Sequence, residues 1–419
     1  MKILLIPPTN FDDKMAGPSI RYYNFLIELG KKHDVIVLLS ELNEFTRSLP
    51  CYMLNKKNVK KMLNWCDIVI TQGLTLFHYP SIKNTKKVLV IDLYDPFILE
   101  NLEIRKKDFV GKILYRIDLK ILREQLLAGD FFICSNQRQI DYWIGSLSIV
   151  GAIDVNNYYK RKKISDIIGI VPFGIPSEVP QQTSPGVLRD KTEGFSNDDF
   201  IVQWAGGSWK WLDIETVIKA FSIIKTKNEK VKLFIMGGKQ NAELKELCLR
   251  YDVLGKNVIL GDWIPYNKRQ DYLLDSDIGL VTHFDILETR YSHRTRVLDY
   301  IWCSLPIVST MGDYLSDVLI EKKNVGVNVD YENPNELADV ILNLSNDMTK
   351  LDFYKSNLDN IHGQLKWSNV MEDLLRYCEN PMKIAKYKSN PFTFFSSIIL
   401  TNLKWSIYHF RKFNKKVRK

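Results

Sequence analysis

The stretch THFDILETRYSHRTRVLDYIWCSLPIVSTMGD, residues 282–313, decides the predicted fold. It follows the apolar run Ile278–Val281, which predicts a buried parallel strand. Residues 293–304 then carry apolar side chains at helical spacing, and Ile307–Thr310 predicts the next strand. A strand, a helix and a second strand in this order are typical of a parallel α/β sheet.

The same stretch places two acids and three arginines around the junction between the first strand and the helix. In open α/β sheets, ligands bind beyond the carboxyl ends of the strands, and the free amide groups of a helix N-terminus favour phosphate there. We expect this helix to start at Ser292, His293, Arg294 and Thr295. Arginine suits phosphate because its planar fork donates paired hydrogen bonds. The cluster therefore predicts a site for a sugar bound to a diphosphate.

The remaining charged residues of the cluster have expected roles in the same site. Asp299 lies further along the helix, where its carboxylate can accept hydrogen bonds from ribose hydroxyls. Glu288 lies in the loop, where it can accept them from sugar hydroxyls, and Arg296 adds a second cation for the diphosphate. The alternative is a solvated surface ion network, which is the commoner position of charges on helices. Their shared place at a strand end favours the ligand site.

A glycine-rich strand end precedes this cluster. Phe200–Ala205 predicts a short strand, and Gly206, Gly207, Ser208 and Lys210 follow it. Glycine lets the backbone approach a ligand closely, and the lysine can then direct its charge at a phosphate. Taken alone, the two glycines are explained equally well by a plain tight turn.

On these motifs the sequence resembles the nucleotide-sugar-dependent glycosyltransferases of the GT-B fold, in the large retaining group called family four. That group carries an acid in a loop and then a helix whose acid precedes a Gly-Leu-Pro-Val-Val strand. The counterparts here are Glu288, Asp299 and the run Ser304–Val308. Asp299 stands where the family usually has glutamate, and Ser304 replaces the glycine.

The resemblance implies further site residues. The loop of Trp263 and Ile264 corresponds to the family's loop against the nucleotide base, although Trp263 is equally explained as a packing residue. In the N-terminal half, the family's glycine loop corresponds to Gly17, with Arg21 one turn further on. The adjacent proline gives a structural explanation of that helix start, so both interpretations stay open.

Asp92 and Asp95 follow another predicted strand, Val88–Ile91. Many family members have a histidine near this position that contacts the donor sugar. The change indicates either a different hydroxyl pattern in the sugar or a helix capped at Pro96. We expect the two aspartates and Arg21 on the acceptor or sugar side of the site.

Strands and helices alternate in both halves, which predicts an α/β fold of two Rossmann-like, doubly wound domains that face each other across a cleft. Residues 1–176 form the N-terminal, acceptor-side domain in this interpretation. Residues 177–198, rich in Pro, Ser, Thr and Gly, predict a linker, and residues 199–380 form the nucleotide-sugar-binding domain. As the resemblance implies, a helix within Trp367–Tyr377 is expected to cross back to the first domain.

The positive charge of the chain is concentrated at its C-terminus. Of the formal net charge of +9, all is contributed by residues 381–419, which contain ten Lys or Arg and no acid. The body therefore has no overall charge that would favour nucleic acid. In the tail, Phe395, Ile399, Leu403 and Ile407 recur every four residues beside basic ones. This predicts a basic amphipathic helix on an anionic membrane surface, with docking on the protein body as the alternative.

Cysteine and histidine spacing argues against other classes of site. The six cysteines are scattered without a C-x-x-C, and the histidines lack paired-ligand spacing. We therefore expect buried thiols and no metal. The resemblance implies a nucleoside diphosphate sugar as the donor substrate and no cofactor. No G-x-G-x-x-G appears, which disfavours a nicotinamide or flavin site.

The sequence and its resemblance together imply a glycosyltransferase of cell-surface glycan biosynthesis. It would move a sugar to a lipid-linked or polysaccharide acceptor with retention at the anomeric carbon. The short first apolar run, Ile3–Ile6, predicts no signal peptide, so the expected location is the cytoplasm, peripheral at the inner face of the plasma membrane. The alternatives are a nucleotide-sugar epimerase of the same fold and a non-catalytic subunit that binds a glycan or a partner.

Overall fold

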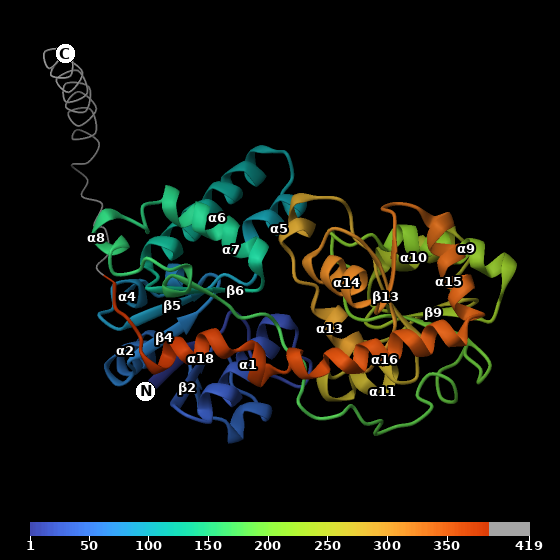
Figure 1. The fold of residues 1–419 in the computed structure, drawn as a ribbon, viewed down its shortest axis with the longest axis horizontal. Helices are drawn as coiled ribbons and strands as arrows, with labels where there is room; N and C mark the ends of the chain where they lie inside the picture. The colour runs from blue at the N-terminus through green and yellow to red at the C-terminus, as the bar shows by residue number, and fades with distance from the viewer. Residues whose placement is uncertain (385–419) are drawn as a thin grey trace, which may run out of the picture.

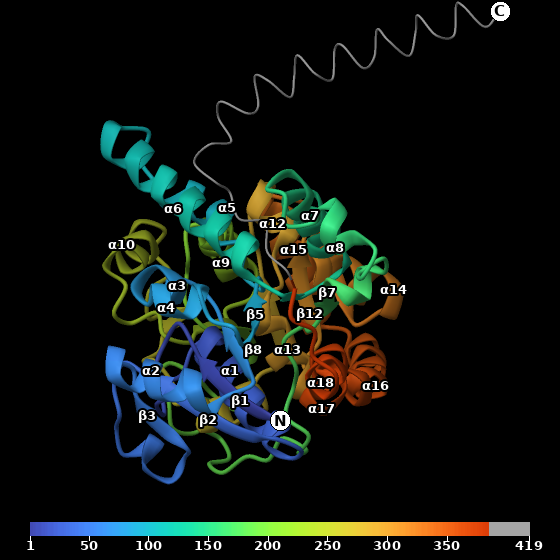
Figure 2. The same cartoon turned by 90° about the vertical axis from the view of Figure 1, so that its left-hand side faces the viewer.

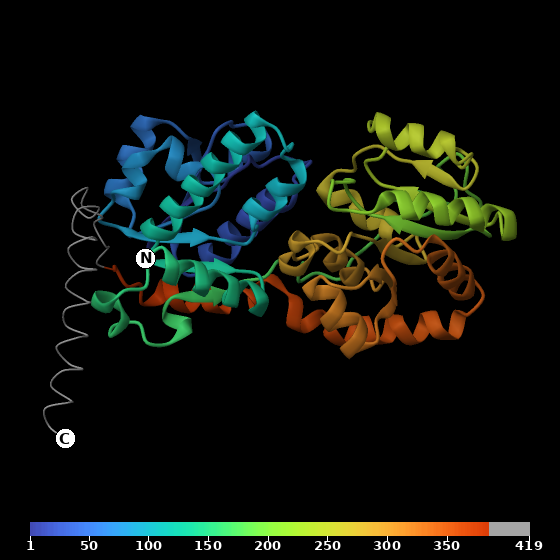
Figure 3. The same ribbon diagram turned by 90° about the horizontal axis from the view of Figure 1, so that it is seen from above.

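The computed structural model describes residues 1–384. Most of the predicted basic tail, including its proposed membrane helix, thus lies outside the described residues. Two α/β lobes lie side by side, and the C-terminal helices run along both of them (Figure 1). Seen from above, the lobes are distinct and are joined by this helical segment (Figure 3). Within residues 1–384, no helix is both long and apolar enough to cross a membrane.

The first lobe is built on a seven-stranded parallel sheet in the order β3-β2-β1-β4-β5-β6-β7. Its strands are β1 (Lys2–Ile6), β2 (Asp34–Leu39), β3 (Cys51–Met53), β4 (Ile68–Thr71), β5 (Val88–Asp92), β6 (Phe131–Cys134) and β7 (Ile168–Ile170). Its helices are α1 (Gly17–Gly30), α2 (Lys56–Trp65), α3 (Thr75–His78), α4 (Pro80–Lys83), α5 (Phe97–Ile104), α6 (Phe109–Ala128), α7 (Gln137–Ile149) and α8 (Val155–Tyr158). Helix α6 stands out from the body of the lobe (Figure 2).

The second lobe is built on a six-stranded parallel sheet in the order β10-β9-β8-β11-β12-β13. Its strands are β8 (Phe200–Trp204), β9 (Val231–Ile235), β10 (Val258–Leu260), β11 (Ile278–Val281), β12 (Ile307–Thr310) and β13 (Gly326–Val329). Its helices are α9 (Ile214–Lys227), α10 (Ala242–Arg250), α11 (Arg269–Leu273), α12 (Leu287–Tyr291), α13 (Thr295–Trp302), α14 (Glu321–Lys323), α15 (Pro334–Ser345) and α16 (Met348–Leu365).

The strands are continuous apolar runs because both faces of each sheet are buried. In β1, Ile3 and Leu5 belong to one hydrophobic core, whereas Leu4 and Ile6 belong to a second core on the opposite face. A half-exposed strand would alternate apolar and polar residues instead. This pattern confirms the predicted doubly wound α/β fold.

The sequence located the central strands better than the outer ones. The predicted strands Ile278–Val281 and Ile307–Thr310 are confirmed as β11 and β12. The strands β3, β7 and β13 were not predicted, and all three are edge strands. Much of the surface of β3 and β13 is not buried, so they lack the apolar signal, whereas β7 is only three residues long. The predicted helix over residues 293–304 was wrong at its start. Ser292 and Arg294 have extended backbones, so a separate α12 ends before them and α13 begins at Thr295.

The C-terminal segment crosses back to the first lobe, as expected. It contains α17 (Trp367–Val370) and α18 (Glu372–Glu379). The amide of Ile175 donates to the carbonyl of Leu365 at 2.8 Å, and the amide of Trp367 donates to the carbonyl of Ile175 at 3.1 Å. A Cβ at Gly174 would lie 2.8 Å from the Trp367 ring, so glycine is needed where the two segments touch. The end of the second domain in sequence is therefore part of the first lobe in space.

The predicted linker, residues 177–198, is packed against the second lobe. Leu188 is fully buried in a small core with Ile201 and Phe234, and Arg189 pairs with Asp277 at 2.7 Å.

The six cysteines are all unpaired, and all but Cys51 are buried, which confirms the prediction of free thiols.

Ser304, which replaces the family's glycine, has a φ of +50°. A side chain in this left-handed region costs roughly 1 kcal/mol, which glycine avoids. The Ser304 hydroxyl donates to the Asp359 carboxylate at the surface. We expect Ser304→Gly to be more stable than Ser304→Ala by about 1 kcal/mol, because both lose the hydroxyl and only alanine keeps the Cβ. Thermal unfolding of the two variants measures the difference, and equal melting temperatures would contradict it.

Candidate functional site

The two lobes enclose a cleft at the carboxyl ends of their sheets. Strand β1 lies between β2 and β4, and β8 lies between β9 and β11, so both are the points where strand order reverses. Ligands of doubly wound sheets bind at such points. Two adjoining pockets occupy this cleft, and they share the residues Ala16, Gly17, Trp209, Thr295 and Arg296.

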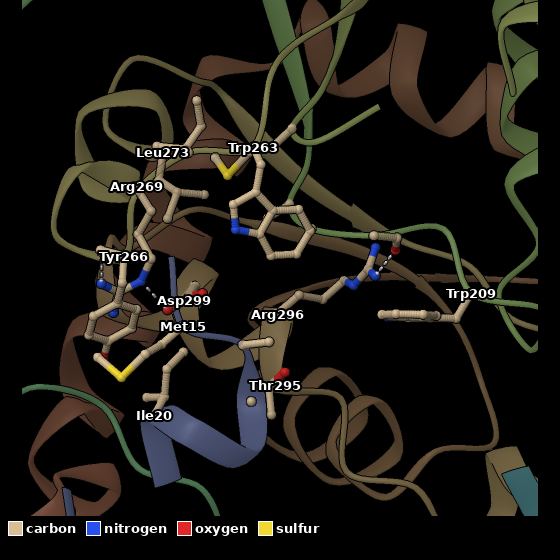
Figure 4. A pocket seen from close by; sticks show the side chains of 17 residues that line it. Met15, Ile20, Trp209, Trp263, Tyr266, Arg269, Leu273, Thr295, Arg296 and Asp299 are labelled. Atoms are coloured by element: carbon tan, nitrogen blue, oxygen red, sulfur yellow. Dashed lines mark hydrogen bonds and ion pairs between the residues drawn. The ribbon is translucent and has the colours of Figure 1, made fainter. Parts of the chain in front are cut away.

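The first pocket lies mainly against the second lobe (Figure 4). Trp263 and Ile264 line it, as the resemblance implies, together with Gly207. Met15 and Ile20 close it from the first lobe. Its walls are therefore largely apolar and aromatic, which suits a flat base.

Arg296 extends through the first pocket to the loop that follows β8. Its Nη2 donates to the carbonyl of Gly207 at 2.6 Å (Figure 4, dashed line), and its guanidinium lies 4.6 Å from the ring of Trp204. Its Nη1 is buried without a hydrogen-bond partner, and within residues 1–384 no carboxylate pairs with it. Burial lowers the pKa of Arg296 to about 10. A buried cation without a counter-ion favours an anionic ligand.

The start of α13 adds amide groups to the same place. Its N-cap residue, Arg294, makes no side-chain capping bond, and Thr295 lines both pockets. The first amides of an uncapped helix are free to bind an anion. Gly206 lines the first pocket with Thr295 and has a φ of +88°, a conformation that favours glycine. Arg296, the helix start and this loop together form a site suited to a diphosphate.

The second pocket lies on the other side of Arg296 and contains Glu288, Ser292 and Arg294. Arg294 binds Glu288 through two hydrogen bonds, Nη1–Oε1 at 2.9 Å and Nη2–Oε2 at 2.6 Å. Both side chains are buried, at 7% and 2% exposure. Glu288 thus neutralises Arg294, and the pair fixes the α12–α13 loop.

The first lobe contributes Asp95 and Glu100 to the second pocket. The carboxylate of Asp95 accepts from Gln72 at 2.9 Å and does not cap α5, whose N-cap makes no side-chain bond. Burial, and then the nearby Asp92, raise the pKa of Asp95 to about 6. Burial raises the pKa of Glu100 as well. Asp95 can therefore exchange a proton near pH 6.

Three hydrogen bonds join the lobes around the pockets. The Tyr94 hydroxyl donates to the carbonyl of His293 at 3.1 Å, and Gln139 donates to the carbonyl of Tyr291 at 2.7 Å. On the far side of the first pocket, the amide of Tyr266 donates to the carbonyl of Asp13 at 2.8 Å. The cleft is thus closed on two sides.

Arg21 and Asp92, which we expected on the acceptor or sugar side, do not line these two pockets, although Asp92 lines a hollow that shares Asp95 and Glu100 with the second pocket. They form a fully buried ion pair with Nε–Oδ2 at 2.7 Å and Nη2–Oδ1 at 3.1 Å. Arg21 also donates to the carbonyl of Pro172 and lies 4.4 Å from the Tyr94 ring. All its polar ends are used, so it positions the wall of the cleft instead of facing a ligand.

Lys210 and Ser208 also lie outside both pockets. The Lys210 ammonium is exposed and pairs with Glu243 at 3.1 Å, and Ser208 accepts from Asn241 at 2.9 Å. The glycine loop turns the lysine towards solvent. The cation that reaches this loop is Arg296.

Asp299 lines the first pocket as expected, but one of its carboxylate oxygens already accepts a hydrogen bond. The Nε of Arg269 donates to its Oδ1 at 2.9 Å, and the Arg269 guanidinium stacks 3.8 Å from the Tyr266 ring. Arg269, Tyr266 and Tyr94 were not predicted as site residues. Arg269 and Tyr266 come from a segment without a motif. Tyr94 could have been predicted, because it stands between Asp92 and Asp95.

Among residues 1–384, no group of three His, Cys, Asp or Glu side chains is arranged to hold a metal ion.

Residues 200–347 match the family model described as Glycosyl transferases group 1. The second domain is a group 1 glycosyltransferase domain. The matched range contains Arg296, Glu288 and the loop after β8, so the family assignment and the site rest on the same part of the chain.

The chain is similar in fold to several solved structures. Sucrose-phosphate synthase from Thermosynechococcus elongatus is 13% identical, with a TM-score of 0.64 over 91% of this chain and 100% of that one. HepE from Anabaena, in complex with UDP and glucose, is 15% identical, with a TM-score of 0.67 over 90% and 99%. WaaG, a glycosyltransferase involved in lipopolysaccharide biosynthesis, is 13% identical, with a TM-score of 0.65 over 91% and 100%. A search of curated protein sequences finds no match.

The GT-B fold predicted for this glycosyltransferase is therefore confirmed over nearly the whole chain. The match of residues 200–347 to this family identifies the chain as a glycosyltransferase.

The Arg21–Asp92 pair gives a stability prediction. Arg21→Met leaves Asp92 buried without its cation, and we expect it to lower the free energy of unfolding by about 3–5 kcal/mol. Adding Asp92→Asn removes the stranded charge and keeps an acceptor for the Tyr94 amide, so the double variant should be more stable than Arg21→Met. Denaturant unfolding of both proteins tests this. An equal or lower stability of the double variant would show that packing, not charge, dominates.

The raised pKa of Asp95 gives a pH prediction. The folded protein holds this proton up to about pH 6, whereas the unfolded chain releases it near pH 4. Ionisation therefore costs stability as the pH rises between these values, and the full cost is present above them. Asp95→Asn should match the natural protein near pH 4 and melt at a higher temperature above pH 7. Melting curves from pH 4 to 8 measure this, and a pH-independent difference would contradict the assigned pKa.

Proposed function

We propose that this glycosyltransferase moves a sugar from a nucleoside diphosphate sugar to a lipid-linked or polysaccharide acceptor, with retention, in cell-surface glycan biosynthesis. One observation carries the donor site: Arg296 is half-buried between the two pockets, and its Nη1 is buried with no hydrogen-bond partner and no counter-ion within residues 1–384. A buried, unpaired charge is costly in the free protein. A diphosphate would supply the missing anion and the missing acceptors.

The pockets on either side of Arg296 fit the two ends of such a donor. The base would lie against Trp263 and Ile264, and the ribose hydroxyls near Asp299. The sugar would lie in the second pocket, where Glu288 and Asp95 offer carboxyl groups to its hydroxyls. The solved complex of the similarly folded HepE with UDP and glucose supports this type of ligand.

The proposed reaction uses the leaving group as base. The acceptor oxygen attacks the anomeric carbon on the face from which the diphosphate departs, the bond from that carbon to the phosphate oxygen breaks, and the acceptor proton passes to that oxygen. Arg296 and the amides of the α13 N-terminus would stabilise the charge that develops on the diphosphate. Arg294, held by Glu288, would position the sugar side.

We propose that the reaction needs no metal ion and no cofactor. The charge usually offset by a divalent cation would be met here by Arg296 and the helix amides. The first pocket also lacks the carboxylate cluster that such a cation prefers, because Asp299 is already paired with Arg269.

The acceptor and the location complete the proposal. We place the enzyme in the cytoplasm at the inner face of the plasma membrane, held there by an anionic membrane surface and not by nucleic acid. The basic and apolar pattern of residues 381–419 supports this. A lipid-linked acceptor would then be presented at the surface where the enzyme lies.

Donor binding should separate Arg296 from Lys210. Arg296→Met removes an uncompensated buried charge, so the ligand-free variant should melt no lower than the natural protein, whereas its diphosphate affinity should fall about 10- to 100-fold. Lys210→Met is the matched control, because this exposed lysine pairs with Glu243 outside the pockets. Thermal stabilisation and calorimetry with UDP, GDP, ADP, TDP and CMP and their sugars measure both effects. Equal losses in the two variants would contradict the assignment.

Product analysis then separates the alternatives. With the donor that stabilises the protein, transfer to an acceptor with an unchanged anomeric configuration supports the proposal. Conversion of the donor to an isomer without acceptor would identify an epimerase. Donor binding without either product would identify a non-catalytic subunit.

A further inference from the structure

A third cavity adjoins the sugar side of the donor site, and no part of the donor is assigned to it. It lies in the first lobe, and its volume of about 370 Å³ is within the range of small-molecule sites. We call it the α5 hollow; its polar lining includes Gln72, Asp92, Asp95, Glu100 and Asp118. Asp95 and Glu100 also line the second pocket, so the two cavities meet at these two carboxyl groups. A ligand in the α5 hollow would therefore face the sugar that we place in the second pocket.

Each side-chain amide or guanidinium group that lines the α5 hollow already donates to an acceptor. Arg105 donates to Asp118 from its Nε at 3.2 Å and from its Nη2 at 3.0 Å. The amide of Asn101 donates to the same carboxylate at 2.9 Å, and that of Gln125 donates to the carbonyl of Gly73. Among the lining residues in the described part of the chain, Arg105 is the one cation, and Asp118 neutralises it. The hollow is therefore poorly suited to bind an anion.

Hydrogen-bond acceptors of the α5 hollow, in contrast, are left without donors. Gln72 is 7% exposed; its Nε2 donates to Asp95 at 2.9 Å, and its Oε1 is buried with no partner within residues 1–384. Within the same residues, the Glu100 carboxyl has neither a hydrogen-bond nor an ion-pair partner, and the Asp95 carboxyl has only Gln72. Burial and then Asp95 raise the pKa of Glu100. Because a buried acceptor without a donor is costly, these groups favour a ligand that brings hydrogen-bond donors.

We propose that the α5 hollow binds the end of the acceptor as a sugar without negative charge, whose hydroxyls donate to Gln72, Asp95 and Glu100. A hydroxyl can donate to each of these groups and brings no charge into the hollow. An ionised phosphate or carboxylate on the sugar brings no donor, and it would lie beside two carboxyl groups that have no cation partner in the described residues. The hollow thus selects neutral sugars against anionic ones. That the bound sugar is the acceptor rests on the proposed function; its binding and its selectivity do not.

Sugar binding to the full chain without any nucleotide tests the hollow directly. Saturation-transfer NMR would use the methyl glycosides of glucose, galactose, mannose and N-acetylglucosamine, each beside its 6-phosphate. We expect at least one neutral glycoside to bind, and its 6-phosphate to bind about tenfold more weakly or less. Gln72→Met should lower the affinity for the neutral glycoside about tenfold, because Gln72 lines the hollow and not the second pocket. Gln137→Met, at an exposed position of α7, is the matched control and should leave it unchanged. Binding of no neutral glycoside, or equal affinities of the two variants, would overturn the proposal.

Removal of the two charges tests the selectivity. In Asp95→Asn with Glu100→Gln, the preference for the neutral glycoside over its 6-phosphate should fall about tenfold, because both side chains keep their shape and lose their charge. Asp141→Asn with Glu103→Gln makes the same change at exposed positions outside the cavities and should keep the preference. A preference of the natural protein for the 6-phosphate, or an unchanged preference in the first double variant, would overturn the proposal.

The role of the bound sugar is tested last, by adding the nucleoside diphosphate sugar that stabilises the protein. Transfer to the neutral glycoside that binds, and not to its 6-phosphate, supports an acceptor site in the α5 hollow. Transfer to the 6-phosphate instead would overturn it. Selective sugar binding by a chain that binds no diphosphate would contradict the proposed function and still support the selectivity of the hollow, so the two failures are distinguishable.

Discussion

Arg21 and Asp92 form an ion pair closed to water, and the first-lobe wall of the cleft is arranged around it. Asp92 ends β5, Arg21 comes from α1, and the Pro172 carbonyl that Arg21 also binds belongs to the segment leaving the lobe. The guanidinium supports the Tyr94 ring, whose hydroxyl holds the α12–α13 loop of the second lobe. One buried charge pair thus links three segments distant in sequence to the sugar side of the site.

The arginines around the cleft are of two kinds. Three are paired with carboxylates and hold the site in place, whereas Arg296 has no carboxylate partner within residues 1–384. Arg21 and Arg294 are each neutralised by a buried carboxylate, and Arg269 is held by Asp299. Arg296 has only a backbone carbonyl and an aromatic ring as partners. Because a desolvated charge destabilises the free protein, its free energy is recovered when an anion binds.

The sequence predicted the parts of this site that depend on local patterns. Buried strands such as β11 and β12 are continuous apolar runs, and the position of Arg296 relative to them follows from the chain. Lys210 was expected at the diphosphate because it follows a glycine loop, yet a loop's sequence does not fix the direction of its next side chain. The pairing of Asp299 with Arg269 joins elements without any shared motif. Such long-range partners are set by packing, which a single sequence does not report.

The connection between the lobes is narrow, and this bears on how ligands enter. Two chain segments cross between the lobes, and they pair with each other where Ile175 meets Leu365 and Trp367. The contacts across the cleft include single hydrogen bonds from Tyr94 and from Tyr266, and an ion pair between Arg138 and Asp317. A single hydrogen bond or a partly exposed ion pair contributes on the order of 1 kcal/mol net, so opening the cleft on the paired segments as a hinge costs little compared with unfolding either lobe. A donor that binds both lobes at Gly17 and Arg296 would favour the closed arrangement, and loss of its sugar would weaken that preference and allow the diphosphate to leave.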